Sequence, residues 1–296
     1  MGIRLAAAAS TALLAIILAA PANSTTLFST GTPDDRMASA SRPDSTGKIE
    51  IETADDFVLA GPASITGATF TGLLGGGAGI ADVGEVAVKI YRVFPSDSDV
   101  APTSGPPVFS TPKVPTRVNS PADIALGTRS AAASSLTFST TGLGSVTALN
   151  SVLNGINPKP NQTTGGDGAV TGQEVLFSVS FTTPFSLPSG HYFFVPEVQV
   201  TTAGGNFFWL SAPSPIVDGT GPFSPDLQGW IRNADLAPDW LRVGTDVVGA
   251  GEFNFAFSLQ GDIASETPLP ATLPLFAGGL GALSLLGWRR KQARAA

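Results

Sequence analysis

The chain contains no cysteine and a single histidine, His191. Without cysteine, an exported domain cannot be stabilised by disulfides, and thiol-based catalysis is excluded. One histidine without cysteine also argues against a zinc site, because these two residue types are the main zinc ligands in proteins. A stable domain must therefore depend on the size of its hydrophobic core, which a body of about 240 residues can supply.

Charged residues are also scarce. They make up 13% of the chain, and 23 acidic residues against 16 basic ones give a net charge of -7. Five of the basic residues lie near the two ends, so the body between them carries -12 once five positive charges are subtracted from the total. Such a surface repels nucleic acid and anionic lipid, and we expect no nucleic-acid partner.

The N-terminus has the three parts of a secretory signal peptide. Residues 1–4 are a short basic start, residues 5–20 are almost entirely apolar, and Ala20 and Ala22 supply the small residues that signal peptidase needs at its cleavage site. We therefore expect signal peptidase to remove residues 1–22. An N-terminal transmembrane helix is the weaker alternative, because the apolar run is only about sixteen residues and no charge cluster follows it.

The C-terminus combines a proline-containing segment, a long apolar run and a basic end. Residues 267–271 read Thr-Pro-Leu-Pro-Ala, and the apolar run at 272–288 is just long enough to cross a bilayer before a basic stop. This order predicts a membrane-spanning segment with its charges inside. The alternatives are a permanent anchor, which the glycines of the run would weaken by about 1 kcal/mol each, and a hairpin buried in a soluble domain.

This tail resembles the PEP-CTERM sorting signal of Gram-negative bacteria, in the variant that reads Val-Pro-Leu-Pro-Ala (VPLPA), with Thr267 in place of valine. The resemblance implies that a membrane-embedded exosortase recognises the Pro-Leu-Pro segment and cleaves nearby. It also implies an inner-membrane intermediate, followed by release or transfer to the cell surface or an extracellular polysaccharide matrix. The residues that carry the resemblance are Pro268, Leu269, Pro270, Ala271, Arg289, Arg290 and Lys291.

Between the two ends we expect a single exported domain at residues 45–262. A mobile leader would precede it at 23–44, a linker with the sorting motif would follow at 263–271, and the membrane segment and basic tail would occupy 272–296. The phrases at 54–59, 88–95 and 237–242 also resemble a group of exported bacterial proteins that have no assigned activity. That resemblance implies one exported domain and transfers no catalytic residue.

The body has the patterning of an all-β fold. At 174–181 and 253–260, apolar and polar residues alternate with period two, which is typical of half-buried antiparallel strands. Further strands are predicted at 48–52, 56–59, 64–72, 85–94, 135–139, 191–195, 197–201 and 206–210. The best helical candidate is the short stretch 146–153. We expect an antiparallel β-sandwich of jelly-roll-like type, with residues 96–121 as a surface excursion between strands.

Two aromatic runs, at 192–194 and 207–209, are too continuous for strands with one wet face. They predict central strands covered on both sides, or strands whose outer aromatics line a groove.

One region has residues suited to sugars. It combines aromatic faces with charged hydrogen-bonding groups, at Trp230, Arg232, Asp239, Trp240 and Arg242. Aromatic faces stack on pyranose rings, and carboxylates and guanidinium groups bind sugar hydroxyls. We take these five residues as a candidate carbohydrate-binding site. The alternative is that both tryptophans pack in the core and the charges lie on a loop.

Metal binding and catalysis have weaker signals. The acidic pairs at 34–35, 55–56 and 97–99 could bind calcium, although none matches an EF-hand loop, so no cofactor is expected beyond that alternative. There is no Gly-x-Ser-x-Gly motif, and Glu50, Glu52, Asp55 and Asp56 are the nearest candidates for a glycosidase carboxylate pair. We expect a protein that is not an enzyme.

The expected function is therefore a non-catalytic, polysaccharide-associated binding module at the cell surface or in the extracellular matrix. A self-associating matrix or surface-layer protein is the first alternative. A surface polysaccharide hydrolase is the second.

Overall fold

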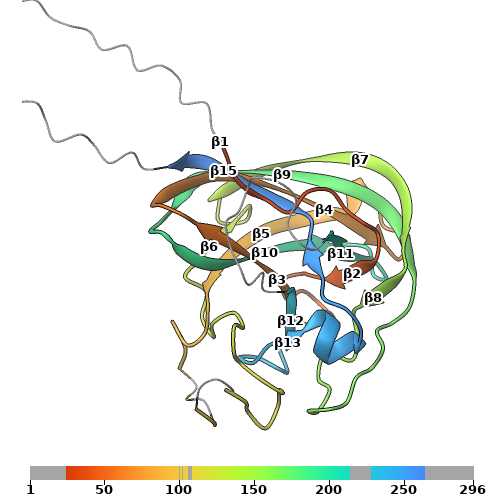
Figure 1. The fold of residues 1–296 in the computed structure, drawn as a ribbon. Helices are drawn as coiled ribbons and strands as arrows, with labels where there is room; N and C mark the ends of the chain where they lie inside the picture. The colour runs from red at the N-terminus through yellow and green to blue at the C-terminus, as the bar shows by residue number, and fades with distance from the viewer. Residues whose placement is uncertain (1–24, 100, 102, 106–108, 214–227, 264–296) are drawn as a thin grey trace, which may run out of the picture.

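The computed structural model describes residues 25–99, 101, 103–105, 109–213 and 228–263, which form two β-sheets packed face to face (Figure 1). The predicted all-β sandwich is thus confirmed. The signal peptide and the sorting tail lie outside the described residues. In the described ranges, no helix combines the length and the apolar composition needed to cross a bilayer.

The larger sheet has nine strands. Its main path runs β1-β15-β4-β11-β2-β8, while β9 pairs with the free side of β4, β7 pairs with β9, and β14 pairs with β11. All pairs are antiparallel except β2 with β8. The strands are β1 (Thr25–Ser29), β2 (Met37–Ala40), β4 (Ala63–Gly75), β7 (Leu136–Ala148), β8 (Asn150–Val152), β9 (Val170–Leu187), β11 (Asn206–Ala212), β14 (Asn254–Phe255) and β15 (Phe257–Ile263).

The second sheet has six strands in the order β13-β12-β3-β10-β5-β6. Its strands are β3 (Ile51–Leu59), β5 (Val83–Arg92), β6 (Gly127–Ser130), β10 (Gly190–Val200), β12 (Trp230–Asn233) and β13 (Leu241–Arg242). Two short helical turns, η1 (Ile80–Asp82) and η2 (Val243–Val248), complete the described elements.

The core between the sheets is built from aromatic rings. Phe70 of β4 stacks on Phe177 of β9 at a centroid distance of 5.0 Å, and Phe194 of β10 stacks on Phe257 of β15 at 4.9 Å, which joins the two sheets. Burial of each ring stabilises the fold by about 1.5–3 kcal/mol. The inward residues of the two alternating segments are buried as predicted, and the two aromatic runs lie on the central strands β10 and β11.

A second apolar layer covers the outer face of the six-stranded sheet. Part of the segment at 93–126 packs over this face, with Arg117 and Ala122 fully buried. The residues enclosed there are Ala54, Tyr91, Phe193, Val195, Trp230 and Trp240. The excursion predicted at 96–121 is therefore partly a core element, and β10 is buried on both faces because this cover adds a third layer.

Two sequence-based expectations are corrected. Residues 25–44, expected to belong to a mobile leader, contain β1 and β2, and Phe28, Met37 and Ala38 are buried in the core. The helix expected at 146–153 is the end of β7 followed by β8. In both places backbone pairing to neighbouring strands overrides a weak local signal.

Candidate functional site

The two tryptophans of the candidate carbohydrate site are core residues. Trp230 is 2% exposed and Trp240 is fully buried. The Trp240 ring meets Tyr91 edge to face at 5.5 Å, and its indole N–H donates to the carbonyl of Ala122 at 3.2 Å. Neither ring presents a face to solvent, so stacking on a sugar is not available to them. Both tryptophans therefore pack in the core, which was the alternative interpretation of the sequence.

The charged members of that candidate site form internal pairs. Arg232 donates to the carboxylate of Glu52 and lies over the Trp240 ring at 4.3 Å. Asp239 accepts from Arg117 at 2.8 Å and from the hydroxyl of Thr111 at 2.8 Å. These contacts hold the cover of the sheet in place.

Arg242 lies apart from this cluster. Its guanidinium pairs with Asp246 of η2 at 2.6 Å. The five residues chosen from the sequence therefore do not converge on one open surface.

A buried ionic cluster lies beside the tryptophans on the same face. The ammonium of Lys89 lies 2.6 Å from Glu50, 2.9 Å from Glu52 and 3.1 Å from Glu197. In the described residues, these three carboxylates are the one group whose oxygens are close enough together to bind a metal ion. Lys89 places one positive charge between the three carboxylates, and Arg232, which is paired with Glu52, places a second one beside them.

Burial and charge move the pKa values of this cluster in opposite directions. Burial raises the pKa of Glu197 to about 8, although Lys89 opposes the shift. Burial also acts to raise the pKa of Glu52, but Arg232 and Lys89 outweigh it and lower that pKa. Burial acts to lower the pKa of Lys89, and the carboxylates of Glu52 and Glu197 outweigh it and raise that pKa. Burial and charge thus move the pKa values of two neighbouring glutamates, Glu197 and Glu52, apart on one face.

Asp55 and Asp56 point to opposite sides of β3, because successive residues of a strand alternate between its faces. Asp55 accepts from the backbone N–H of Phe255 at 2.7 Å, on the side of the large sheet. Asp56 lies 2.6 Å from the Nε2 of His191, on the outer side. The pair cannot converge on one calcium ion or one glycosidic bond.

The other acidic segments are also engaged within the fold. Asp34 accepts from the hydroxyl of Ser211, and Asp97 pairs with Arg92 at 3.5 Å. The backbone N–H of Asp99 donates to Asp123 at 3.0 Å. The first two contacts hold loops against strands, and the third joins two parts of the segment between β5 and β6.

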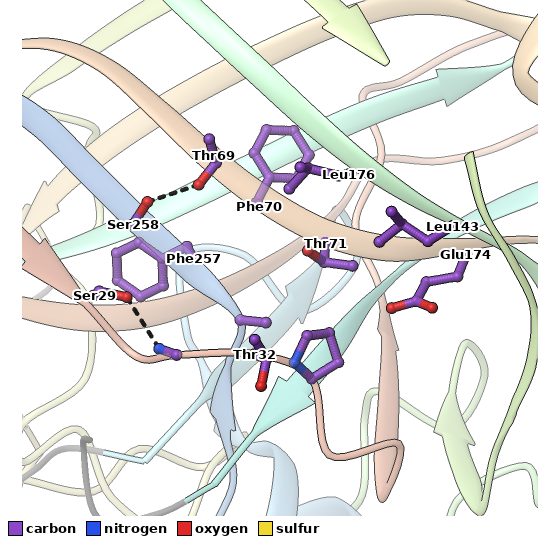
Figure 2. A pocket seen from close by; sticks show the side chains of 13 residues that line it. Ser29, Thr32, Thr69, Phe70, Thr71, Leu143, Glu174, Leu176, Phe257 and Ser258 are labelled. Atoms are coloured by element: carbon purple, nitrogen blue, oxygen red, sulfur yellow. Dashed lines mark hydrogen bonds between the residues drawn. The ribbon is translucent and has the colours of Figure 1, made fainter. Parts of the chain in front are cut away.

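An open groove lies on the outer face of the nine-stranded sheet (Figure 2). It has a volume of about 410 Å³ and crosses β15, β4 and β9 between the loop after β1 and Leu143 of β7. It is lined by Ser29, Gly31, Thr32, Pro33, Thr69, Phe70, Thr71, Leu143, Glu174, Leu176, Ala256, Phe257 and Ser258.

The polar groups of the groove are hydroxyls with one carboxylate. The hydroxyls of Thr69 and Ser258 lie 2.7 Å apart across neighbouring strands, and Ser29 accepts from the N–H of Gly31 at 3.1 Å (Figure 2). Burial, followed by the nearby charge of Asp35, raises the pKa of Glu174. None of the lining residues is basic. The groove therefore suits an uncharged, hydroxyl-rich ligand better than an anion.

Apolar walls face these polar groups. Pro33, Leu143 and Leu176 border the groove, and Leu143 is 50% exposed. A sugar ring also combines hydroxyls with C–H faces, which makes the mixture of walls and floor chemically suitable.

The sequence did hold a signal for this groove. Thr69, Thr71 and Ser258 are the polar positions of alternating strands, which the pattern alone describes only as solvent-facing. Pro33 belongs to the segment 23–44, for which the sequence predicts a mobile leader. Their convergence depends on the pairing of β15 with β4, which the local sequence does not specify.

Comparison of the chain with protein-family models, with curated proteins and with solved structures finds no match.

Proposed function

We propose that this chain is an exported protein of a Gram-negative cell, delivered through signal peptidase and an exosortase to the cell surface or the extracellular matrix. The support for delivery is the order of features in the sequence: a signal-type start at 1–22 and a sorting-type tail built on Pro268, Leu269 and Pro270. The acidic body is consistent with this route, because it has no attraction to anionic lipid.

We further propose that the sandwich is of jelly-roll-like type and acts there as a non-catalytic module that binds polysaccharide. The observation that carries this proposal is the groove on the nine-stranded sheet, where the hydroxyls of Thr69 and Ser258 and the carboxylate of Glu174 lie between apolar walls. Because the groove has no basic lining residue, the ligand class that fits best is a neutral polysaccharide. Weak binding by one groove becomes useful when many copies share one matrix.

The experiment compares two hydroxyl pairs of the same sheet. Thr69→Val with Ser258→Ala removes the pair in the groove, and Thr147→Val with Thr171→Val removes a pair that is also 2.7 Å apart but lies outside the groove. Affinity electrophoresis in gels of a neutral glucan measures retention of each variant.

We expect the first double variant to lose most of its retention and the second to keep it, because lost hydroxyls weaken binding only where they contact the ligand. Equal retention by both variants would remove the groove as the binding site. Stronger retention in an anionic polysaccharide would contradict the ligand class.

A further inference from the structure

β7 is the one long strand of the described fold that has a strand partner on only one side. It holds 13 residues and pairs only with β9. The other strands with a single neighbour are short: β1, β6, β8, β13 and β14 have two to five residues each. In Figure 1, β7 runs along the outer margin of the sheet beside β9. Its second edge presents unpaired backbone groups.

Natural edge strands are commonly protected by charges or proline, and β7 has neither. Residues 130–158 contain no Asp, Glu, Lys, Arg or His, in a chain whose net charge is -7. The edge strand β6 shows the contrast, because Arg129 extends from it and donates to the carbonyls of Thr183 and Pro184. Two acidic copies of this chain would therefore repel each other least along β7.

The bulge in β7 limits the part of the edge that can pair. The register with β9 shifts between Gly142 and Gly144, and Gly144 has a φ of 126°. A bulge bends a strand and interrupts its ladder. The straight part of the edge is therefore residues 136–141, in which Thr137, Ser139 and Thr141 are exposed on the outer face.

We propose that this part of β7 is a self-association surface, which pairs antiparallel with β7 of a second copy about a two-fold axis near Ser139. A two-fold arrangement lets one edge complement itself, since residue i of one copy meets residue j of the other and j meets i. Ser139, on the axis, then faces its own counterpart, and Thr137 faces Thr141. One short strand pair buries less than the roughly 1,200 Å² of a stable interface, so the pairing is weak and depends on concentration. It would link neighbouring copies without covering the ionic cluster.

The test adds one charge to the edge and, as a control, the same charge to an inner strand. Ser139→Lys places like charges opposite each other in the paired dimer, whereas Ser180→Lys puts lysine on the same face of β9, a strand paired on both sides. Sedimentation of the full chain in a mild detergent gives the dissociation constant of each form. We expect Ser139→Lys to weaken self-association about tenfold, and Ser180→Lys to change it less than about twofold.

A mixing experiment separates pairing from damage to the fold. Ser139→Lys and Ser139→Glu should each self-associate more weakly than the unchanged chain. An equal mixture of the two should associate at least as well as the unchanged chain, because opposite charges then meet across the axis. Failure of the mixture to associate would overturn the proposal. So would equal weakening by Ser180→Lys, or an unchanged chain that stays monomeric at every concentration tested.

Discussion

The guanidinium of Arg117 lies 2.8 Å from the carboxylate of Asp239, and the two buried side chains are separated by 122 residues of sequence. This pair joins the excursion that follows β5 to the loop between β12 and β13. Asp123 accepts from the other side of the same guanidinium at 2.6 Å. The cover of the six-stranded sheet is therefore held by one arginine with two carboxylates.

Removal of one of these carboxylates should destabilise the fold strongly. Asp239→Asn leaves a fully buried guanidinium with a single charged partner, and breaking a buried pair typically costs about 3–5 kcal/mol. Thermal unfolding measures the loss. The matched control is Asp97→Asn, because Asp97 and Arg92 are partly exposed and such pairs contribute about 1 kcal/mol or less. Equal losses of stability in the two variants would show that the buried pair contributes no more to stability than the exposed pair.

The stability of the fold should fall as Glu197 ionises. Its pKa is about 8 in the folded protein against an ordinary value of 4.5, so the folded state holds a proton that the unfolded state has lost across this range. The contribution of Glu197 is therefore complete below pH 4.5 and is lost as the pH rises through 8. Glu197→Gln mimics the protonated side chain and should lack this loss.

The measurement is the free energy of unfolding in urea at several pH values. We expect the difference between Glu197→Gln and the unchanged chain to grow in favour of the variant as the pH rises. A difference that stays constant with pH would mean that Glu197 is ionised throughout, with Lys89 outweighing burial.

Trp240 should matter to the fold and not directly to ligand binding. The sequence indicates Trp240 as one of five candidate carbohydrate-binding residues. Because the ring is fully buried, we now expect Trp240→Ala to cost about 3–5 kcal/mol of stability. Trp240→Phe, which keeps an aromatic ring in place, should remain folded and bind polysaccharide as well as the unchanged chain. Loss of binding by a folded Trp240→Phe would contradict this assignment.

Glu174 should give ligand binding at the groove a pH dependence. An ionised carboxylate accepts stronger hydrogen bonds from hydroxyls than an amide does, so Glu174→Gln should weaken binding about fivefold near neutral pH. Since burial raises the pKa of Glu174, binding by the unchanged chain should decline as the medium becomes acidic. Titration calorimetry with a soluble glucan measures both effects. A pH dependence that persists in Glu174→Gln would assign it to another group.

Processing of the tail can be tested without knowledge of the ligand. In a host that carries an exosortase, intact-mass spectrometry of surface and medium fractions should find a product that begins near Asn23 and ends near Pro268. Replacement of Pro268 and Pro270 by alanine should leave the tail attached and the protein in the membrane fraction. Retention of Trp288 in the unchanged, exported chain would indicate a permanent anchor instead.

The fold class could be predicted because period-two alternation reports directly on burial of one strand face. The alternating segments at 174–181 and 253–260 made that signal clear. β2 gave no such signal. Its four residues, Met-Ala-Ser-Ala, are all buried, and Ser39 is accommodated by a hydrogen bond of 2.7 Å to Thr53. In the sequence, a short buried strand that contains a hydrogen-bonded serine cannot be told from a loop segment.

The ionic cluster could not be predicted because it depends on which strands are neighbours, as does the convergence of the groove residues. Glu52 meets Arg232 through the pairing of β3 with β12, and Lys89 reaches Glu197 through the pairing of β5 with β10. Residues far apart in sequence thus neutralise one another. For Trp230 and Trp240, composition alone could not separate a ligand platform from a packed layer, because that choice depends on the cover built by 93–126.

The ammonium of Lys89 has a further consequence if the protein is exported as proposed. A calcium ion among three carboxylates can be removed by a chelator or lost when the medium is diluted, whereas a lysine side chain is covalently fixed. The three carboxylates therefore keep their positively charged partner at any calcium concentration in the medium.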